Sequence, residues 1–463
     1  MSDIVADLLR ELGPSLVAVG VDIPARNHSD WVGVAPAEPL ALVRPRSTED
    51  LATTVRLCAA QAVPVVAQGG LTGLAGGAEP RADWVAISLE RMNGIEEIDP
   101  ATGTMLVKAG TPLEVVQQAA SEAGFFYPVD LGARGTATIG GTIATNAGGN
   151  RVIRYGMTRQ SILGLEVVLA DGTIVNALNR FLKNNAGYDI KQLFIGTEGT
   201  LGIVTRAVLR LEAEPGFTSA AVCGLPDYPA IVELLKFARR KLGSGLTAFE
   251  VMWPSFYDLM TSKVEGVRPP LAGRHGMYVL IESQGTDEAF DAPRFAAFLE
   301  SAFEEGLIED AAVARSQGDV QAFWKIRDSV SEFSHVLGPD TALDISLRVA
   351  EMDDFVEEAN VALRQAFPDM QSVSFGHVGD NNLHLNIHVP GLSKQPKPEI
   401  QAIVYELVRR RQGSVSAEHG IGTIKAPFLP YSRNAAEIGL MERLKDALDP
   451  KALLNPGKVL IRR

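Results

Sequence analysis

The stretch GHVGDNNLHLNIHV, residues 376–389, predicts a β-hairpin and with it an antiparallel sheet in the second half of the chain. Residues 379–382 are turn formers, and polar and apolar side chains alternate on both sides of them, as in strands. A hairpin closed by this loop pairs His377 with His384. Directly opposed side chains lie about 4.5–5.5 Å apart at Cβ, so the two imidazoles can share one metal ion. Asn386 points to the same face.

A second stretch, SAEHGIG at residues 416–422, places Glu418 beside His419 ahead of two glycines. Glu418 can supply a third metal ligand. Three protein ligands leave one coordination position open, which is the arrangement of a catalytic divalent ion. His419 is then available as a base near neutral pH. The alternative is that Glu418 only orients His419 and that each histidine is an ordinary core or hairpin residue.

Length, charge and cysteine content exclude several classes of protein. The 463 residues are too many for a single core. The net charge of −13, without a basic block, argues against nucleic acid and anionic membranes as partners. The two cysteines have no paired spacing, which argues against a disulfide framework, a CxxC zinc site and an iron–sulfur cluster. With no signal peptide and no transmembrane segment in the sequence, we expect a reducing, cytoplasmic location.

Two glycine-rich stretches follow predicted strands in the first half. GGLTGLAGG, residues 69–77, can approach a diphosphate closely through its backbone N–H groups. It leads into another strand at 84–89 rather than a helix, which excludes the Rossmann fingerprint; a flexible turn is the alternative. The stretch at 131–149 is too long for a turn and too rich in small residues for a packed strand. It suits a backbone lying flat against a large planar ligand.

The remaining pattern predicts a two-lobed α/β unit ending near Leu211, followed by alternating strands and helices. Helix-start signals stand at Ser47 and at Thr111-Pro112. Further helices are expected at 228–242 and 352–366.

The motifs resemble one family in the same order along nearly the whole chain. The N-terminal half resembles the flavin-binding domain (PCMH type) of the vanillyl-alcohol oxidase and p-cresol methylhydroxylase superfamily. GHVGDNNLHLN and SAEHGIG are similar to motifs of its FAD-linked D-2-hydroxyacid dehydrogenases, which act on D-lactate, D-2-hydroxyglutarate or glycolate. The resemblance implies an α+β fold: a two-lobed flavin-binding α/β domain at 1–211, an α+β cap domain with an antiparallel sheet and the metal-binding hairpin at 212–415, and a segment at 416–463 that returns to the FAD domain.

The resemblance implies that FAD is bound without a covalent link, because the first loop has Leu71 and neither histidine nor cysteine where some relatives tether the flavin. The implied cofactor-binding residues come from four separate segments. They are Gly69, Gly70, Leu71, Thr72, Gly73, Leu74, Thr138, Gly140, Gly141, Thr145, Asn146, Gly148, Gly149, Glu198, Gly199, Ile203, Val204 and Asn455.

The same resemblance implies roles for the polar residues of the second half. His377, His384 and Glu418 match the ligands of a divalent metal, zinc in most relatives, and His419 matches the catalytic base. Arg327 matches the arginine that binds the substrate carboxylate, a role that its bidentate fork suits.

Two further residues are candidate substrate contacts. Ser331 stands one helical turn after Arg327, on the same face. Asn386 resembles a carboxylate contact. A surface-helix arginine and an ordinary strand asparagine are the alternatives for Arg327 and Asn386.

One departure from the family bears on the substrate. The D-2-hydroxyglutarate enzymes have a lysine where this chain has Ala342, and Arg348 stands where the family usually has proline. Either Arg348 binds a second carboxylate or the substrate has none. D-2-hydroxyglutarate and D-lactate therefore both stay open as substrates.

The implied reaction is FAD-dependent, metal-assisted oxidation of a D-2-hydroxyacid to the 2-oxoacid, with hydride transfer to flavin N5. A separate acceptor, an electron-transfer flavoprotein or a quinone or cytochrome, would reoxidise the flavin, and a homodimer is compatible with the pattern. The alternatives are an FAD oxidase that uses oxygen directly, a metal-dependent hydrolase, which would leave both glycine-rich stretches without a role, and a non-catalytic flavin-binding subunit.

Overall fold

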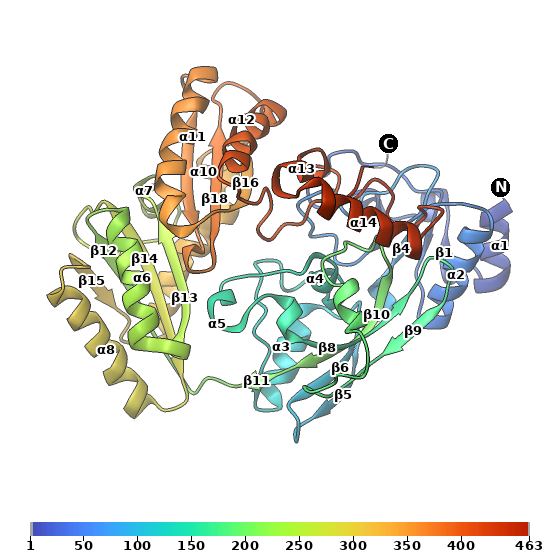
Figure 1. The fold of residues 1–463 in the computed structure, drawn as a ribbon, viewed down its shortest axis with the longest axis horizontal. Helices are drawn as coiled ribbons and strands as arrows, with labels where there is room; N and C mark the ends of the chain where they lie inside the picture. Colours follow the sequence, from blue (N-terminus) through green and yellow to red (C-terminus); the bar gives the residue numbers. More distant parts are fainter. Residues whose placement is uncertain (1–2, 462–463) are drawn as a thin grey trace. The chain divides into compact units, whose positions relative to one another are not determined.

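The computed structural model describes residues 3–461, which form two compact units (Figure 1). Unit 1 comprises Met1–Gly149, Gly156–Glu214 and Glu418–Arg463, and unit 2 comprises Asn150–Tyr155 and Pro215–Ala417. The outermost residues of the predicted domains, 1–2 and 462–463, lie outside the described part. The structure differs from the predicted ranges in placing residues 150–155 in unit 2, because Arg151 Nε donates to buried Glu282 at 3.3 Å there.

Unit 1 contains two larger sheets. The first has the order β1-β2-β4-β3, in which β4 pairs in parallel with β2 and β3. The second is antiparallel, with the order β5-β6-β10-β8-β9. The strand bounds are β1 Val17–Ala18, β2 Ala41–Val43, β3 Val65–Gln68, β4 Val85–Ser88, β5 Ile95–Asp99, β6 Thr104–Lys108, β8 Ile162–Val168, β9 Ile174–Ala177 and β10 Ile203–Arg210. The short β7 Phe125–Phe126 pairs with β11 Glu212–Ala213.

Local signals explain how the helices of unit 1 begin. The bounds are α1 Asp3–Leu12, α2 Thr48–Ala60, α3 Leu113–Glu122, α4 Ile139–Thr145, α13 Leu429–Ser432 and α14 Ala435–Leu448. The predicted cap at Ser47 is confirmed, since its Oγ accepts from Asp50 N at 3.1 Å. The predicted cap at Thr111 is wrong: its hydroxyl donates to the carbonyl oxygen of Lys108 at 2.7 Å, and Pro112 takes the N-cap position.

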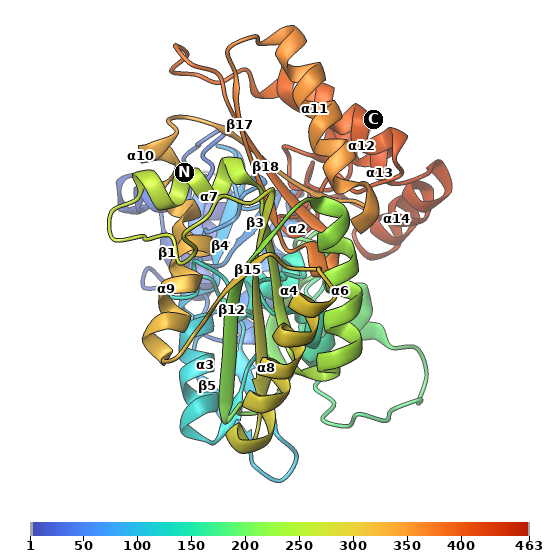
Figure 2. The same ribbon diagram turned by 90° about the vertical axis from the view of Figure 1, so that its left-hand side faces the viewer.

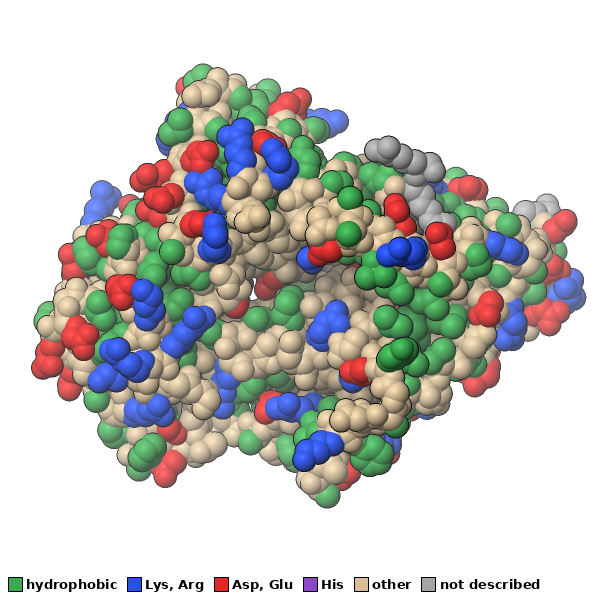
Figure 3. Space-filling view, viewed as in Figure 1, with side chains coloured by type: hydrophobic (Ala, Val, Ile, Leu, Met, Phe, Trp, Pro, Cys, Tyr) green, Lys and Arg blue, Asp and Glu red, His purple; other side chains and the backbone are tan. Residues whose placement is uncertain are grey.

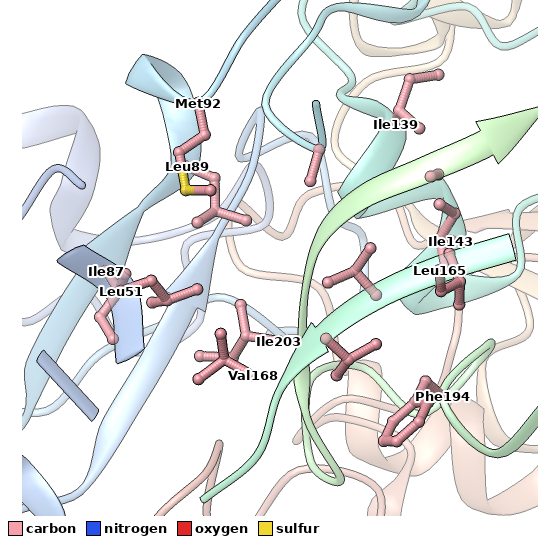
Figure 4. Close-up of a cluster of buried hydrophobic side chains, with 14 of the residues drawn as sticks. Leu51, Ile87, Leu89, Met92, Ile139, Ile143, Leu165, Val168, Phe194 and Ile203 are labelled. Atoms are coloured by element: carbon pink, nitrogen blue, oxygen red, sulfur yellow. The ribbon is translucent and has the colours of Figure 1, made fainter. Parts of the chain in front are cut away.

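The two sheets of unit 1 share one hydrophobic core. Figure 4 shows its members: Leu51 from α2, Ile87 from β4, Ile143 from α4, Leu165 from β8 and Ile203 from β10. Each of these side chains is at most 2% exposed. Because removal of this apolar surface from water stabilises both lobes together, the lobes form a single body.

The C-terminal segment is held in unit 1 by buried polar contacts. Asn455 takes a left-handed conformation, with φ 44°. Its Oδ1 accepts from Ala67 N, in β3, at 2.9 Å, and its Nδ2 donates to Glu198 O at 2.6 Å. One side chain thus joins three segments that are far apart in the sequence.

Unit 2 is built on one antiparallel sheet of seven strands, in the order β15-β12-β14-β13-β17-β18-β16. The bounds are β12 Phe217–Leu225, β13 Leu246–Met252, β14 Met277–Gly285, β15 Asp310–Val313, β16 Thr341–Ser346, β17 Gln371–Gly376 and β18 Asn382–His388. The predicted α+β fold class with an antiparallel sheet in the second half is confirmed.

Helices cover both faces of this sheet. The bounds are α5 Val152–Tyr155, α6 Tyr228–Leu242, α7 Pro254–Lys263, α8 Glu288–Glu304, α9 Gln317–Asp328, α10 Phe333–Val336, α11 Met352–Ala366 and α12 Lys397–Arg410. Helices α6 and α8 lie on one side of β12 and β14, and α9 lies on the other (Figure 2). Side chains of α7 and α9 share a hydrophobic core with β12, β14 and β17. The predicted helices at 228–242 and 352–366 are confirmed.

The surface carries charges of both signs. On the face that Figure 3 shows, Lys and Arg side chains alternate with Asp and Glu side chains rather than forming one field. Among residues 3–461, no helix is both long enough and apolar enough to cross a membrane.

Replacing Asn455 by alanine is expected to destabilise unit 1, because it leaves the N–H of Ala67 and the carbonyl of Glu198 without their partner. A loss of about 2 kcal/mol corresponds to a fall in Tm of roughly 4–8 °C for a unit of this size. Differential scanning fluorimetry measures it. Asn93→Ala is the control, since Asn93 is exposed and donates only to Glu90 O; equal Tm values for the two variants would contradict the prediction.

Candidate active site

The first glycine-rich loop fits an anionic ligand. A Cβ on Gly70 would lie 1.9 Å from Thr136 O, and one on Gly69 would lie 2.5 Å from Thr138 Oγ1. The loop and the second glycine-rich stretch therefore touch through their backbones. Within the described residues, the N–H groups of residues 70–73 donate no hydrogen bond to protein atoms. Leu71 has φ 59°. Such a run of free N–H groups suits a diphosphate.

The second stretch contains a helix that the sequence did not predict. Helix α4 begins at Thr138, whose Oγ1 accepts from Gly141 N at 3.3 Å. Gly140 packs so closely on Ala109 that a Cβ would lie 2.8 Å from that residue's Cβ. The expected backbone lying flat over 131–149 is therefore wrong for the part in α4. Thr145 is in its last turn and Asn146 ends it at φ 50°.

Beyond α4, close approach of the backbone again requires glycine, at Gly149. Gly148 is buried, and Gly149 has φ 133°, with a Cβ position 1.9 Å from Asp130 O. Gly149 N donates to Glu418 Oε1 at 2.9 Å. The expected metal ligand Glu418 is thus bonded to the predicted cofactor segment within unit 1.

Glu198 anchors the segment that carries the predicted base. Its buried carboxylate accepts from Ile421 N at 2.7 Å and from Gly422 N at 2.8 Å. Burial raises the pKa of the Glu198 carboxyl, and the two N–H groups oppose that shift. Gly420 has φ 79°, which favours glycine, and its Cβ position lies 2.9 Å from Glu198 Oε1. His419 is therefore flanked by two attachments to unit 1, at Glu418 and at residues 421–422.

The other predicted cofactor residues lie around this anchor or in the first loop. Gly199 has φ 73°, with its Cβ position 3.1 Å from Asn455 Nδ2. Ile203 and Val204 begin β10 and are buried. Thr72 and Gly73 are half-buried and Leu74 is exposed at the end of the loop.

A cavity of about 440 Å³ opens beside the C-terminal segment of unit 1. Cationic side chains contribute to its lining: Arg81, Lys445 and Lys458. Lys458 Nζ donates to Gly76 O at 2.9 Å and to Glu79 O at 2.8 Å. Burial lowers the pKa of Lys458 to about 8. These two hydrogen bonds join the end of the glycine-rich loop to the C-terminal segment.

In unit 2 the hairpin forms with a different register from the predicted one. Phe375, not His377, pairs with His384. The turn begins one residue earlier, because His377 O accepts from Asn382 N at 3.1 Å and Asn381 takes the left-handed conformation at φ 76°. The predicted His377–His384 register is therefore wrong. A shift of two residues keeps the same face of the strand.

The two imidazoles nevertheless lie together. The ring centroids of His377 and His384 are 5.5 Å apart with an edge-to-face orientation. One ligand nitrogen of each lies within 4.8 Å of the other; zinc–nitrogen bonds of about 2 Å put two donors on one ion at most about 4 Å apart. His384 also stacks on Phe375 at 4.9 Å. This half of the donor set fits a divalent ion.

Arg327 is buried in an ion pair rather than exposed on its helix. Its Nε donates to Glu250 Oε2 at 2.7 Å, and its NH2 group lies 3.0 Å from His377 Nε2. The guanidinium lies over the ring of Phe375 at 4.7 Å. Burial alone would raise the pKa of the Glu250 carboxyl, but its contacts with His377 and Arg327 hold that pKa below its usual value. The structure thus brings Arg327 to His377.

Asp344 holds the chain next to the predicted Glu-His pair. It lies opposite His384 across β16 and β18 and is fully buried. Its carboxylate accepts from Asn382 Nδ2 at 3.1 Å and from Ala417 N at 3.2 Å. Ala417 is the last residue of unit 2, and Glu418 follows it directly in the chain.

The remaining predicted substrate contacts have other partners in unit 2. Helix α9 ends at Asp328, and Ser331 lies in the 3₁₀ turn that follows directly, so the helix itself does not extend to Ser331. Asn386 donates to Asp340 Oδ2 at 2.5 Å. Arg348 is exposed and pairs with Glu351 at 2.5 Å. Their roles toward substrate stay predictions.

Sequence reasoning assigned no role to Glu250 or Asp344. Glu250 interrupts the apolar run of β13, and an acid inside such a strand is a signal of a buried partner. Asp344 interrupts β16 in the same way. The partner of each is distant in the sequence, so the signal alone does not identify it.

Family models and curated relatives match most of this chain. Residues 39–178 match the model of an FAD binding domain, and residues 214–459 match that of the C-terminal domain of FAD linked oxidases. The D-2-hydroxyglutarate dehydrogenase of Xanthomonas citri pv. viticola is 40% identical over 437 residues, covering 93% of this chain and 91% of that protein. The mitochondrial D-2-hydroxyglutarate dehydrogenase of Bos taurus is 38% identical over 93% of this chain and 78% of that protein.

Solved structures share the fold at low identity. Substrate-bound p-cresol methylhydroxylase superposes with a TM-score of 0.80 at 18% identity, covering 99% of this chain and 96% of the other. The 4-ethylphenol oxidase of Gulosibacter chungangensis gives 0.77 at 19% identity, covering 99% and 97%. These likenesses confirm the predicted vanillyl-alcohol oxidase type of fold. Together with the matches above, they show that the chain is an FAD-linked oxidoreductase and belongs to the family of FAD-linked D-2-hydroxyacid dehydrogenases.

Proposed function

We propose that this chain oxidises a small D-2-hydroxyacid to the 2-oxoacid with non-covalent FAD and one divalent ion, zinc, as cofactors. The substrate choice is D-2-hydroxyglutarate, the compound named for the relatives, or D-lactate. The observation that carries the proposal is the pair of imidazoles, His377 and His384, brought to one face of the hairpin beside a buried arginine.

The proposed metal ligands are His377, His384 and Glu418. Two of them are adjacent in unit 2. Support for the third is the anchoring of Ala417 to Asp344, directly opposite His384, which fixes the chain one residue before Glu418. A set of two nitrogens and one oxygen is a known donor set of catalytic zinc.

When bound, FAD supplies the acceptor of two electrons and the Cα hydrogen, and the divalent ion supplies Lewis-acid polarisation of the substrate oxygens. The protein's own residues orient the substrate and move its proton. Arg327 offers a guanidinium edge to the α-carboxylate. His419 takes the hydroxyl proton, a contribution of typically 10²–10⁴-fold. The substrate loses one hydride and one proton and becomes the 2-oxoacid.

The second substrate carboxylate, if there is one, needs a cation. Arg348 is the proposed group, since it is exposed and pairs only at the surface with Glu351. Ala342 offers no charge at the position opposite Asn386. A monocarboxylate such as D-lactate needs neither.

We further propose that a separate acceptor, an electron-transfer flavoprotein or a quinone or cytochrome, reoxidises the flavin. Direct reaction with oxygen is the alternative, and rapid release of peroxide on turnover would favour it. We also propose a reducing, cytoplasmic location, which the buried free thiols of Cys58 and Cys223 support. The homodimer stays a prediction.

Anaerobic titration of the bound flavin with a panel of D- and L-2-hydroxyacids tests the reaction. D-2-hydroxyglutarate or D-lactate should bleach the flavin absorbance, and the L-isomers should not. Prior treatment with a chelator should abolish the bleaching, and added zinc should restore it. Bleaching that is unchanged after the metal has been removed would contradict the metal assignment.

Replacing Gly70 by alanine is expected to yield protein without flavin, because the new Cβ would meet Thr136 O at 1.9 Å and part the two glycine-rich segments. Gly132→Ala is the matched control, since no atom lies within 4 Å of its Cβ position. Absorbance at purification measures the flavin content.

Acid precipitation of the wild-type protein should leave the flavin in the supernatant; flavin that stays with the pellet would contradict non-covalent binding.

His419→Asn is expected to slow flavin reduction by substrate about 10²–10⁴-fold through loss of the general base, with FAD still bound. Stopped-flow absorbance under anaerobic conditions measures the rate. His388→Asn is the control, because His388 bonds only to the Pro339 carbonyl at the strand end. A wild-type reduction rate in His419→Asn would exclude it as the base.

A further inference from the structure

Glu250 occupies the centre of a closed three-residue arrangement in unit 2. It lies in β13 and is 1% exposed. Its Oε1 lies 2.7 Å from His377 Nδ1, and its Oε2 accepts from Arg327 Nε at 2.7 Å. Arg327 NH2 closes the ring at 3.0 Å from His377 Nε2. One carboxylate therefore contacts both a proposed metal ligand and the proposed carboxylate-binding arginine.

The donors and acceptors in this ring assign the proton of His377. A guanidinium only donates hydrogen bonds, so His377 Nε2 must accept from Arg327 through its lone pair. The ring proton is then on Nδ1, where it is donated to Glu250. A histidine that binds a metal through Nε2 needs this tautomer, with its other nitrogen donating to a carboxylate.

We propose that Glu250 is a positioning residue for the metal site: it holds His377 with the Nε2 lone pair directed away from itself and keeps Arg327 beside that lone pair. This inference rests on the proposed function. It assigns to Glu250 no contact with substrate or flavin.

The same geometry makes Arg327 a competitor for the metal ligand. The Nε2 lone pair cannot serve NH2 and a cation at once, and the guanidinium and the cation repel each other. Binding of a divalent ion must therefore move NH2 off Nε2, while Nε remains bonded to Glu250. The displaced NH2 edge becomes available to an anionic group such as the substrate carboxylate.

Zinc affinity of the metal-stripped, FAD-loaded protein tests the proposal. Competition with a chromophoric chelator measures the Kd. Glu250→Gln should weaken zinc binding about 10–100-fold, the usual effect of losing the partner of a ligating histidine. Arg327→Met should bind zinc at least as tightly as wild type, because the competitor is gone. A merely structural role of the cluster would weaken binding in both variants.

Glu282→Gln is the matched control. Glu282 is also 1% exposed, lies in the neighbouring strand β14, and bonds to Trp324 Nε1 at 2.8 Å and Thr247 Oγ1 at 2.9 Å without touching His377. Its zinc Kd should stay within about threefold of wild type. Equal weakening in Glu282→Gln and Glu250→Gln, or weakening in Arg327→Met, would overturn the proposal.

A second comparison covers the case in which Glu250→Gln fails to fold. The double variant Glu250→Gln/Arg327→Met removes both buried charges together, so that neither is left unpaired. It should bind zinc more weakly than Arg327→Met alone, and equal affinity would overturn the proposal. If the wild-type protein itself binds no zinc, the proposed function fails at its metal; if it binds zinc and Glu250→Gln binds it equally, only the positioning role fails.

Discussion

A carboxylate buried away from water is stable only where donors surround it, and this chain uses three such carboxylates to fix its site segments. Glu198 accepts from the backbone of Ile421 and Gly422. Asp344 accepts from Ala417 N, and Glu250 holds the side chains of His377 and Arg327. Glu250 and Asp344 lie in strands and Glu198 lies in a turn, and the donors of each come from a distant part of the sequence. The acids therefore join segments that are far apart in the sequence.

The Glu-His pair shows this constraint most clearly. The chain passes from unit 2 to unit 1 between Ala417 and Glu418. Ala417 is bonded to Asp344 in one unit, and residues 421–422 are bonded to Glu198 in the other. Three residues, 418–420, lie between these attachments and belong to no helix or strand.

Much of the architecture could be predicted because its signals are local. The predicted bounds of helices α6 and α11 agree with the observed ones. For α6 the local signals are clear: Asp227 is its N-cap, and Gly243 follows its end at φ 59°. Helix α4 was missed because Gly140 and Gly141 are poor helix formers. Ile139 and Ile143 are four residues apart, as on one face of a helix, and both are buried. Their packing in the core stabilises the helix despite the two glycines.

The site depended on contacts that no local pattern contains. Arg327 is 77 residues from Glu250 in the sequence, and His377 is 127 residues from it. The family resemblance identified Arg327 and His377, but nothing in either segment indicates that one buried acid joins them. Such partners are found only once the order of the strands is known, and here β13 lies next to β17, which leads into His377.

The predicted hairpin register is wrong, yet His377 and His384 lie close together as predicted. Asn381 and Asn382 are equally suited to the left-handed position of the turn, and the sequence does not say which one takes it. The choice of Asn381 moves the pairing by two residues, so that Phe375 rather than His377 faces His384. Side chains alternate with a period of two along a strand, so a two-residue shift leaves both imidazoles on the same face, whereas a one-residue shift would have separated them. The aromatic ring of Phe375 takes the position directly opposite His384, where it stacks on that imidazole and underlies the guanidinium of Arg327.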